Sequence, residues 1–157
     1  MKYRHSFRVN APLQAVADFH ARSASMGAIT PPPVIVRVHH APETLRDGDK
    51  MDFTLWLGLL PIRWLAIIEN TSPNGFSDRQ LKGPFASWHH RHSFLPLDGD
   101  QTEIIDDISY TIKKHPFWGM VGLSMGISLP LLFAFRAWKT RRLLAGQRHD
   151  FAKIIKG

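Results

Sequence analysis

The stretch that decides the fold runs from Phe76 to Phe94 and reads FSDRQLKGPFASWHHRHSF. Side chains alternate between the two faces of a β-strand, so we read this stretch at a period of two. Gly83 and Pro84 in its middle favour a turn, because glycine tolerates positive φ and proline restricts its own φ. The stretch therefore predicts two adjacent antiparallel strands joined by a turn.

One face of these two strands combines aromatic and polar side chains. Its residues are Phe76, Asp78, Gln80, Trp88, His90, His92 and Phe94. The aromatic residues make this face the better candidate for burial. Buried polar groups need hydrogen-bond partners. We therefore expect the carboxylate and the imidazoles to form a hydrogen-bonded cluster inside an apolar chamber.

The rest of the chain predicts a strand over residues 3–9, two short helices between residues 11 and 29, and a long helix after residue 115. Asn10 is suited to cap the first of these helices. Further strands are expected over residues 34–38, 50–57, 62–68 and 101–112. An antiparallel sheet with one solvated face must cover the other face. The final helix is the natural cover.

The same residues resemble a known family. The patterns Phe76-x-Asp78-x-Gln80, Gly83-Pro84-Phe85 and Trp88-x-His90-x-His92-x-Phe94, followed by Thr102-x-x-x-Asp106-x-Ile108-x-Tyr110, resemble the polyketide cyclase/dehydrase-like branch of the START-like (SRPBCC) superfamily. The resemblance covers nearly the whole chain. It implies an α+β helix-grip (START/Bet v 1-like) fold. In that fold a curved antiparallel sheet of about seven strands wraps around a long C-terminal helix, two short helices follow the first strand, and a ligand cavity lies between sheet and helix.

Length and composition narrow the functional classes. A chain of 157 residues is most simply one domain, so we expect residues 1–157 to form a single START-like ligand-binding domain. The chain has no cysteine, which excludes disulfides, thiolate chemistry and cysteine zinc sites. The first residues lack the apolar run of a signal peptide, so we expect a cytoplasmic protein.

The chain is basic, with a formal net charge of +7. We expect a basic C-terminal helix and tail over about residues 117–155, with a solvated charged face. No nucleic-acid-reading motif is present, so no nucleic-acid partner is expected. The basic residues near the C-terminal end are Arg136, Lys139, Arg141, Arg142, Arg148, Lys153 and Lys156.

The segment from His115 to Phe135 contains no Lys, Arg, Asp or Glu, and its length suits a membrane span. Basic residues flank both of its ends, so neither orientation in a membrane is preferred. The sheet would also lose its cover if this helix entered lipid. We therefore expect burial against the sheet, with room for a ligand beside its small residues. The alternative is membrane insertion of this segment, or peripheral membrane contact through the basic helix.

His90, His92, Asp78 and Asp106 are the candidate catalytic residues. A carboxylate that accepts from one imidazole nitrogen orients the other nitrogen as a base. The same four groups could instead fix strand register, recognise a ligand or hold a metal. Two alternate histidines on one strand give only two metal ligands, and no third is evident, so no metal is expected. No cofactor motif is present either.

The leading hypothesis is a binder of a hydrophobic small molecule: a lipid, an isoprenoid or a polyketide-like compound. One alternative is a cyclase- or dehydratase-type enzyme with a His/Asp pair in the cavity, and another is a membrane-associated lipid or quinone chaperone. The aromatic residues of the predicted site could equally be ordinary core residues that contact no ligand. The expected ligand-binding residues are Phe53, Leu55, Trp64, Asp78, Gln80, Trp88, His90, His92, Phe94, Asp106, Tyr110, Met125 and Leu129.

Overall fold

The computed structural model describes the backbone of residues 1–155 and the side chains of residues 1–146, so the expected basic residues Arg148, Lys153 and Lys156 lie outside the described side chains. Seven strands form one sheet in the order β1-β7-β6-β5-β4-β3-β2, and each neighbouring pair is antiparallel. The strands are β1 (Lys2–Val9), β2 (Ile35–His40), β3 (Lys50–Leu57), β4 (Leu60–Ser72), β5 (Gly75–Lys82), β6 (Ser87–Leu97) and β7 (Gln101–Thr111).

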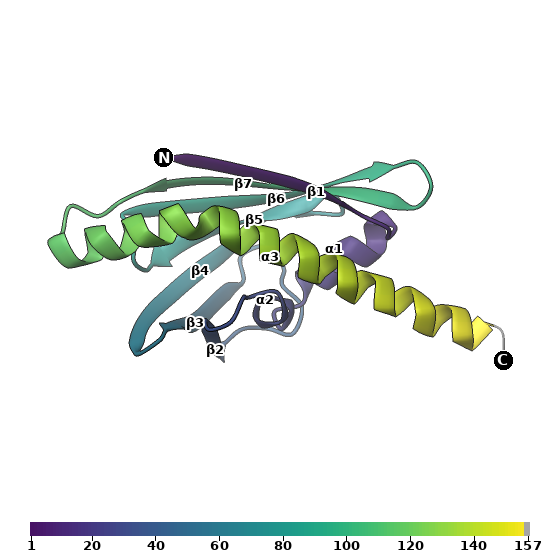
Figure 1. The fold of residues 1–157 in the computed structure, drawn as a ribbon, viewed down its shortest axis with the longest axis horizontal. Coiled ribbons are helices and arrows are strands. Elements are labelled where there is room, and N and C mark those ends of the chain that lie inside the picture. The colour runs from purple at the N-terminus through teal and green to yellow at the C-terminus, as the bar shows by residue number, and fades with distance from the viewer. Residues whose placement is uncertain (156–157) are drawn as a thin grey trace.

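Three helices accompany the sheet: α1 (Leu13–Ala21), α2 (Ser25–Ala28) and α3 (Pro116–Ile155). Figure 1 shows α3 crossing one face of the sheet, with β2, β3 and β4 curving away on one side of it. The α2 helix lies beside β2 and β3 on the same side of the molecule as α3. The predicted order of a strand, two helices, six strands and a long helix is confirmed.

The register of the central strands decides which polar side chains meet. Asp78 on β5 lies opposite His90 on β6, and Phe76 lies opposite His92. On the other side of β6, His92 lies opposite Asp106 of β7. Directly opposite residues share one face of a sheet. The pairing therefore brings two carboxylates and two imidazoles together on the face that α3 covers.

The core has two parts along α3. The first contains Trp64, Phe85, Trp88 and Tyr110 of the sheet, with Leu129 and Phe133 of α3. The second lies where α1 packs on the sheet, and it includes Phe7, Val9, Val16, Phe19, Phe94, Ile104 and Leu144. Full burial of one such aliphatic or aromatic side chain contributes about 1.5–3 kcal/mol. Together these contacts hold α1 and α3 against the sheet.

Several local expectations need correction. The α1 helix begins after Pro12 without a side-chain cap. Asn10 instead accepts a hydrogen bond from Gln101 at 2.8 Å, because the pairing of β1 with β7 places their ends side by side. The second helix is limited to Ser25–Ala28. The β4 strand extends to Ser72 because it pairs with β3 for one part of its length and with β5 for another.

The two faces of α3 differ in their surroundings. The inner face is buried on the sheet, and its buried apolar residues are Val121, Leu129, Phe133, Ala137 and Leu144. The outer face is also apolar and carries the exposed side chains of Met120, Leu123, Ile127, Leu131 and Trp138. Within residues 116–146 the helix is long and apolar enough to cross a membrane, and its most apolar 18-residue window has a mean hydropathy of 1.7, although a core helix can meet the same criteria. The expected burial against the sheet is therefore found for the inner face of α3 and not for its outer face.

Glycines let α3 approach the sheet closely. A Cβ atom on Gly126 would lie 2.5 Å from the Tyr110 hydroxyl, and one on Gly122 would lie 3.5 Å from the Phe85 ring. The space beside these two glycines is therefore filled by side chains of the sheet. The expectation that such residues leave room for a ligand is wrong at these positions, because they serve contact between helix and sheet.

Candidate functional site

A cavity of about 410 Å³ lies between the sheet, α2, the loop that follows it, and α3. Ligand sites in proteins typically have volumes of about 300–1,000 Å³. Its walls are mainly apolar, with side chains from β3, β4, β6 and α3. Among the expected ligand-binding residues, those on its wall are Phe53, Leu55, Trp64, Asp78, Trp88, His90, His92, Met125 and Leu129.

Four expected residues are not part of this wall. Gln80 hydrogen-bonds both backbone groups of Phe85 and so holds the turn between β5 and β6. Phe94 packs in the second part of the core, because α1 covers that end of β6. Tyr110 packs against the Phe85 ring, and its hydroxyl faces Gly126 of α3. Asp106 is buried and contacts both histidines, but it does not line the cavity.

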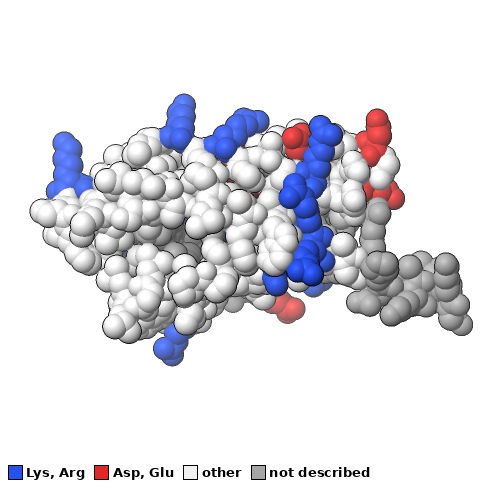
Figure 2. Space-filling view, in the orientation of Figure 1, with Lys and Arg blue, Asp and Glu red and all other residues white. Residues whose placement is uncertain are grey.

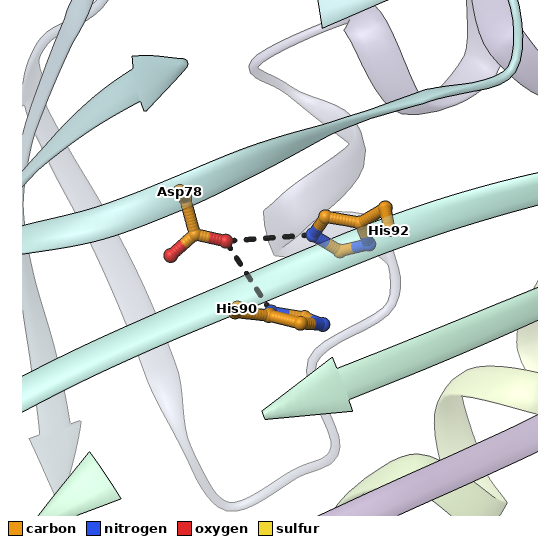
Figure 3. Close-up of side chains that lie close together, drawn as sticks. All are labelled: Asp78, His90 and His92. Carbon is orange, nitrogen blue, oxygen red and sulfur yellow. Dashed lines mark ion pairs between the residues drawn. The ribbon is translucent and has the colours of Figure 1, made fainter. Parts of the chain in front are cut away.

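The polar cluster has a closed side at Asp106, away from the cavity, and an open side at Asp78, which faces the cavity. On the closed side, Asp106 Oδ1 accepts a hydrogen bond from His90 Nε2 at 2.9 Å. The same oxygen lies 2.9 Å from His92 Nδ1, but that nitrogen is out of line for a hydrogen bond. On the open side, Asp78 Oδ2 lies 3.3 Å from His90 Nδ1 and 3.4 Å from His92 Nε2 (Figure 3). The ring centroids of the two histidines are 3.8 Å apart.

Electrostatics favour the charged forms of this cluster. Burial lowers the pKa of His90, but hydrogen bonds and charge from Asp106 and Asp78 outweigh burial and raise that pKa to about 9. Burial raises the pKa of Asp78 and of Asp106. Contacts with the two histidines outweigh it and hold both pKa values well below their usual range. Without a bound ion, His90 is therefore an imidazolium between two carboxylates.

Two residues that the sequence did not single out for the site also line the cavity. Burial, with a smaller contribution from His92, lowers the pKa of His20 to about 4, so its imidazole is neutral at pH 7. His20 Nδ1 donates to the carbonyl of Val16 at 2.8 Å, which leaves Nε2 as a hydrogen-bond acceptor. The signal in the sequence was its spacing: His20 lies one helical turn after the buried Val16.

Arg136 is the second residue that sequence reasoning missed. We expected it on a solvated basic face, and this was wrong. It follows the buried Phe133 by three positions on α3, packs its guanidinium over the Phe133 ring at 5.2 Å and lines the cavity. Its Nε is buried and finds no hydrogen-bond partner among the described residues. Burial lowers the pKa of Arg136.

Comparisons by sequence return nothing: no family model and no curated protein matches the chain. Solved structures do match. Protein CV1439 from Chromobacterium violaceum superimposes with a TM-score of 0.72 at 10% identity, covering 91% of this chain and 96% of that chain. The Zhui aromatase/cyclase from Streptomyces sp. R1128 gives a TM-score of 0.65 at 15% identity, covering 91% of this chain and 95% of that chain.

The protein Ara h 8.0201 also matches, with a TM-score of 0.57 at 12% identity, covering 89% of this chain and 97% of that chain. This chain has a helix-grip fold, like these solved structures. In this helix-grip protein the cavity lies between the sheet and α3, as the sequence resemblance implied. At such low identity the likeness concerns the fold, so the chemistry of the site must be argued from its own residues.

Proposed function

We propose that this helix-grip protein binds a hydrophobic small molecule in the cavity between the sheet and α3. The observation that carries the proposal is the cavity itself, at about 410 Å³ and with mainly apolar walls. A ligand that buries about 250 Å² of apolar surface there gains about 6 kcal/mol at ~25 cal/mol per Å². That gain suffices for binding only if few polar groups of the ligand are left unpaired.

The polar groups on the cavity wall suit an amphipathic ligand. Asp78, His90 and His92 belong to one cluster, and His20 and Arg136 lie on the same cavity. The His20 and His92 rings are 6.2 Å apart. We infer that an oxygen-bearing end of a lipid, isoprenoid or polyketide-like molecule lies here, with its apolar part against Trp64, Phe53 and Met125.

Filling the cavity from within tests this proposal. Ala66 is buried, lines the cavity and carries no polar group, so Ala66→Leu reduces the space without touching the cluster. The matched control is Ala86→Leu, at an exposed position outside the cavity wall. With the fluorescent probe 1-anilinonaphthalene-8-sulfonate, we expect Ala66→Leu to weaken binding at least tenfold and Ala86→Leu to leave it unchanged. Equal affinity in all three proteins, each checked for a cooperative melt, would refute the proposal.

A cyclase- or dehydratase-type enzyme is a second candidate, favoured by His20. Both nitrogens of His90 lie beside carboxylates, so that ring is poorly available as a base, whereas the neutral His20 keeps an unprotonated Nε2, although burial makes it a weak base. The substitution His20→Gln should then lower proton exchange at the α-carbon of a β-diketone in D₂O to the rate measured without protein, while the affinity for the diketone changes little. Loss of exchange and affinity together would assign His20 to binding alone.

A role at membranes is the third candidate, favoured by the outer face of α3. Leu131 is 75% exposed and also lines the cavity, so the cavity adjoins this apolar face. Figure 2 shows the face nearly free of charged side chains along the first part of α3, with Lys and Arg gathered further along. The Lys139 amino group and the Arg142 guanidinium lie 5.9 Å and 5.1 Å from the ring of the exposed Trp138. Aromatic and basic side chains together suit the interface of an anionic membrane.

Vesicle flotation tests this third candidate. We expect the protein to float with phosphatidylserine-containing vesicles at low salt and less at high salt, and not with pure phosphatidylcholine. Ile127 is 72% exposed, so Ile127→Glu should abolish flotation without disturbing the core. Leu95→Glu, at an exposed position on β6, is the control. Flotation that survives Ile127→Glu, or is lost equally in the control, would remove this role.

A further inference from the structure

Three potential metal ligands meet on the open side of the polar cluster. One ligand atom each from Asp78, His90 and His92 lies within 4.8 Å of the other two. Figure 3 shows the Asp78 carboxylate directed at one nitrogen of each histidine ring. His90 and His92 alternate on β6 and so share a face, and the register places Asp78 of β5 on that face as well.

The distances on this side fit a shared ion better than direct hydrogen bonds. Asp78 Oδ2 is 3.3 Å from His90 Nδ1 and 3.4 Å from His92 Nε2, and both distances exceed the roughly 2.7–2.9 Å of a charge-assisted hydrogen bond. Ligands bound at about 2.0–2.2 Å to a tetrahedral zinc ion lie about 3.3–3.6 Å apart. Two edges of the ligand triangle thus already have the length that coordination requires.

Asp106 takes the place of the outer carboxylate that commonly orients metal-bound histidines. Its Oδ1 accepts from His90 Nε2, so the proton of a neutral His90 resides on Nε2 and the lone pair of Nδ1 is directed at Asp78. A lone pair and a carboxylate oxygen repel each other unless a cation lies between them. A divalent ion bound between these atoms would provide that cation.

An ion at this point would be reachable from the cavity. Asp78, His90 and His92 line the cavity wall, whereas Asp106 lies behind them and does not. The two carboxylates balance the charge of a divalent ion. Three protein ligands leave a fourth tetrahedral position, which would open on the cavity, as in zinc sites that activate water or polarise a carbonyl oxygen.

We propose that Asp78, His90 and His92 form a binding site for a divalent transition-metal ion such as Zn²⁺, with Asp106 as the orienting carboxylate. The sequence showed only two ligands on one strand, and the third comes from the neighbouring strand through its register. This site does not depend on the proposed hydrophobic ligand. Binding of the fluorescent probe and binding of metal can therefore fail independently.

Isothermal titration with Zn²⁺, after chelator treatment and dialysis of the full chain, tests the site. We expect one Zn²⁺ per chain, a raised melting temperature with Zn²⁺, and the visible absorption of tetrahedral Co²⁺ when cobalt is used instead. Asp78→Asn should lower the affinity at least 100-fold, and Asp106→Asn about 10–100-fold. His89→Ala should change nothing, because His89 lies next to His90 on the opposite face of β6.

Three results would overturn the proposal. The first is wild-type protein without stoichiometric Zn²⁺ binding. The second is Asp78→Asn with wild-type affinity, and the third is His89→Ala with an equal loss, which would point to surface histidines. If Asp78→Asn fails to fold, His92→Gln serves in its place, and its Co²⁺ spectrum should lose the tetrahedral bands.

Discussion

Replacement of Gly126 by alanine tests how α3 meets the sheet. A Cβ at this position would lie 2.5 Å from the Tyr110 hydroxyl and 3.0 Å from two ring carbons. Tyr110 has little freedom to move, because it is buried and its ring is 5.3 Å from that of Phe85 and 5.9 Å from that of Trp88. Overpacking of this kind costs about 1–3 kcal/mol.

Gly146 provides the matched control, because a Cβ there would meet no atom of the described residues within 4 Å. Alanine in a helix interior is about 1 kcal/mol more favourable than glycine. Gly146→Ala should therefore stabilise the protein, and Gly122→Ala, with ordinary contacts at 3.5 Å, should be nearly neutral or stabilising. Gly126→Ala should be less stable than Gly146→Ala by about 1–3 kcal/mol.

Urea unfolding followed by far-ultraviolet circular dichroism measures these differences, with the midpoint and slope compared across the three variants. The reasoning is refuted if Gly126→Ala gains as much stability as Gly146→Ala. That result would mean that α3 does not pack closely against Tyr110, and another element would then have to bury this face of the sheet.

Two further predictions concern the polar residues. Asp106→Asn should lower the free energy of unfolding by about 1–3 kcal/mol, because a neutral amide replaces one of the two carboxylates beside the buried His90. Asp107→Asn, whose exposed pairs with Arg4 and Arg91 are solvated, should cost at most about 1 kcal/mol, and equal losses in urea unfolding would contradict this account. The folded-state pKa of His20, about 4, lies below the ordinary 6.5, so the unfolded chain binds the proton more readily and stability falls as the pH drops. Between pH 6.5 and pH 5 this contributes a loss of about 2 kcal/mol that His20→Leu should remove, and identical pH profiles of the two proteins would show the assignment to be wrong.

The sequence predicted the fold well because its signals were local and repeated. Period-two alternation in Phe76–Phe94 set the faces of β5 and β6, and turn residues placed their connection. The face of the polar cluster was therefore predictable. Its geometry was not, since the contact of Asp78 with both histidines depends on the register between strands, which alternation alone leaves open.

The sequence-based predictions failed where contacts between distant elements determine whether a residue lies in the core, on the cavity wall or in solvent. Phe94 shares a face with His92, yet α1 covers its end of the strand, so it belongs to the core and not to the cavity. Arg136 carries a charge that usually indicates solvent, but its position on the same helical face as Phe133 leaves it only partly exposed, with its Nε buried. The space beside Gly126 is taken by Tyr110, a contact between elements that spacing within one helix does not show.

The most direct test of the central claim is organic extraction of the purified wild-type protein, followed by mass spectrometry of what is released. The account predicts an amphipathic, oxygen-bearing hydrophobic compound in a fixed ratio to the protein, and much less of it from Ala66→Leu, whose added side chain takes up cavity space. Equal amounts from Ala66→Leu and Ala86→Leu, or a wild-type protein that releases nothing and binds no hydrophobic probe, would contradict it.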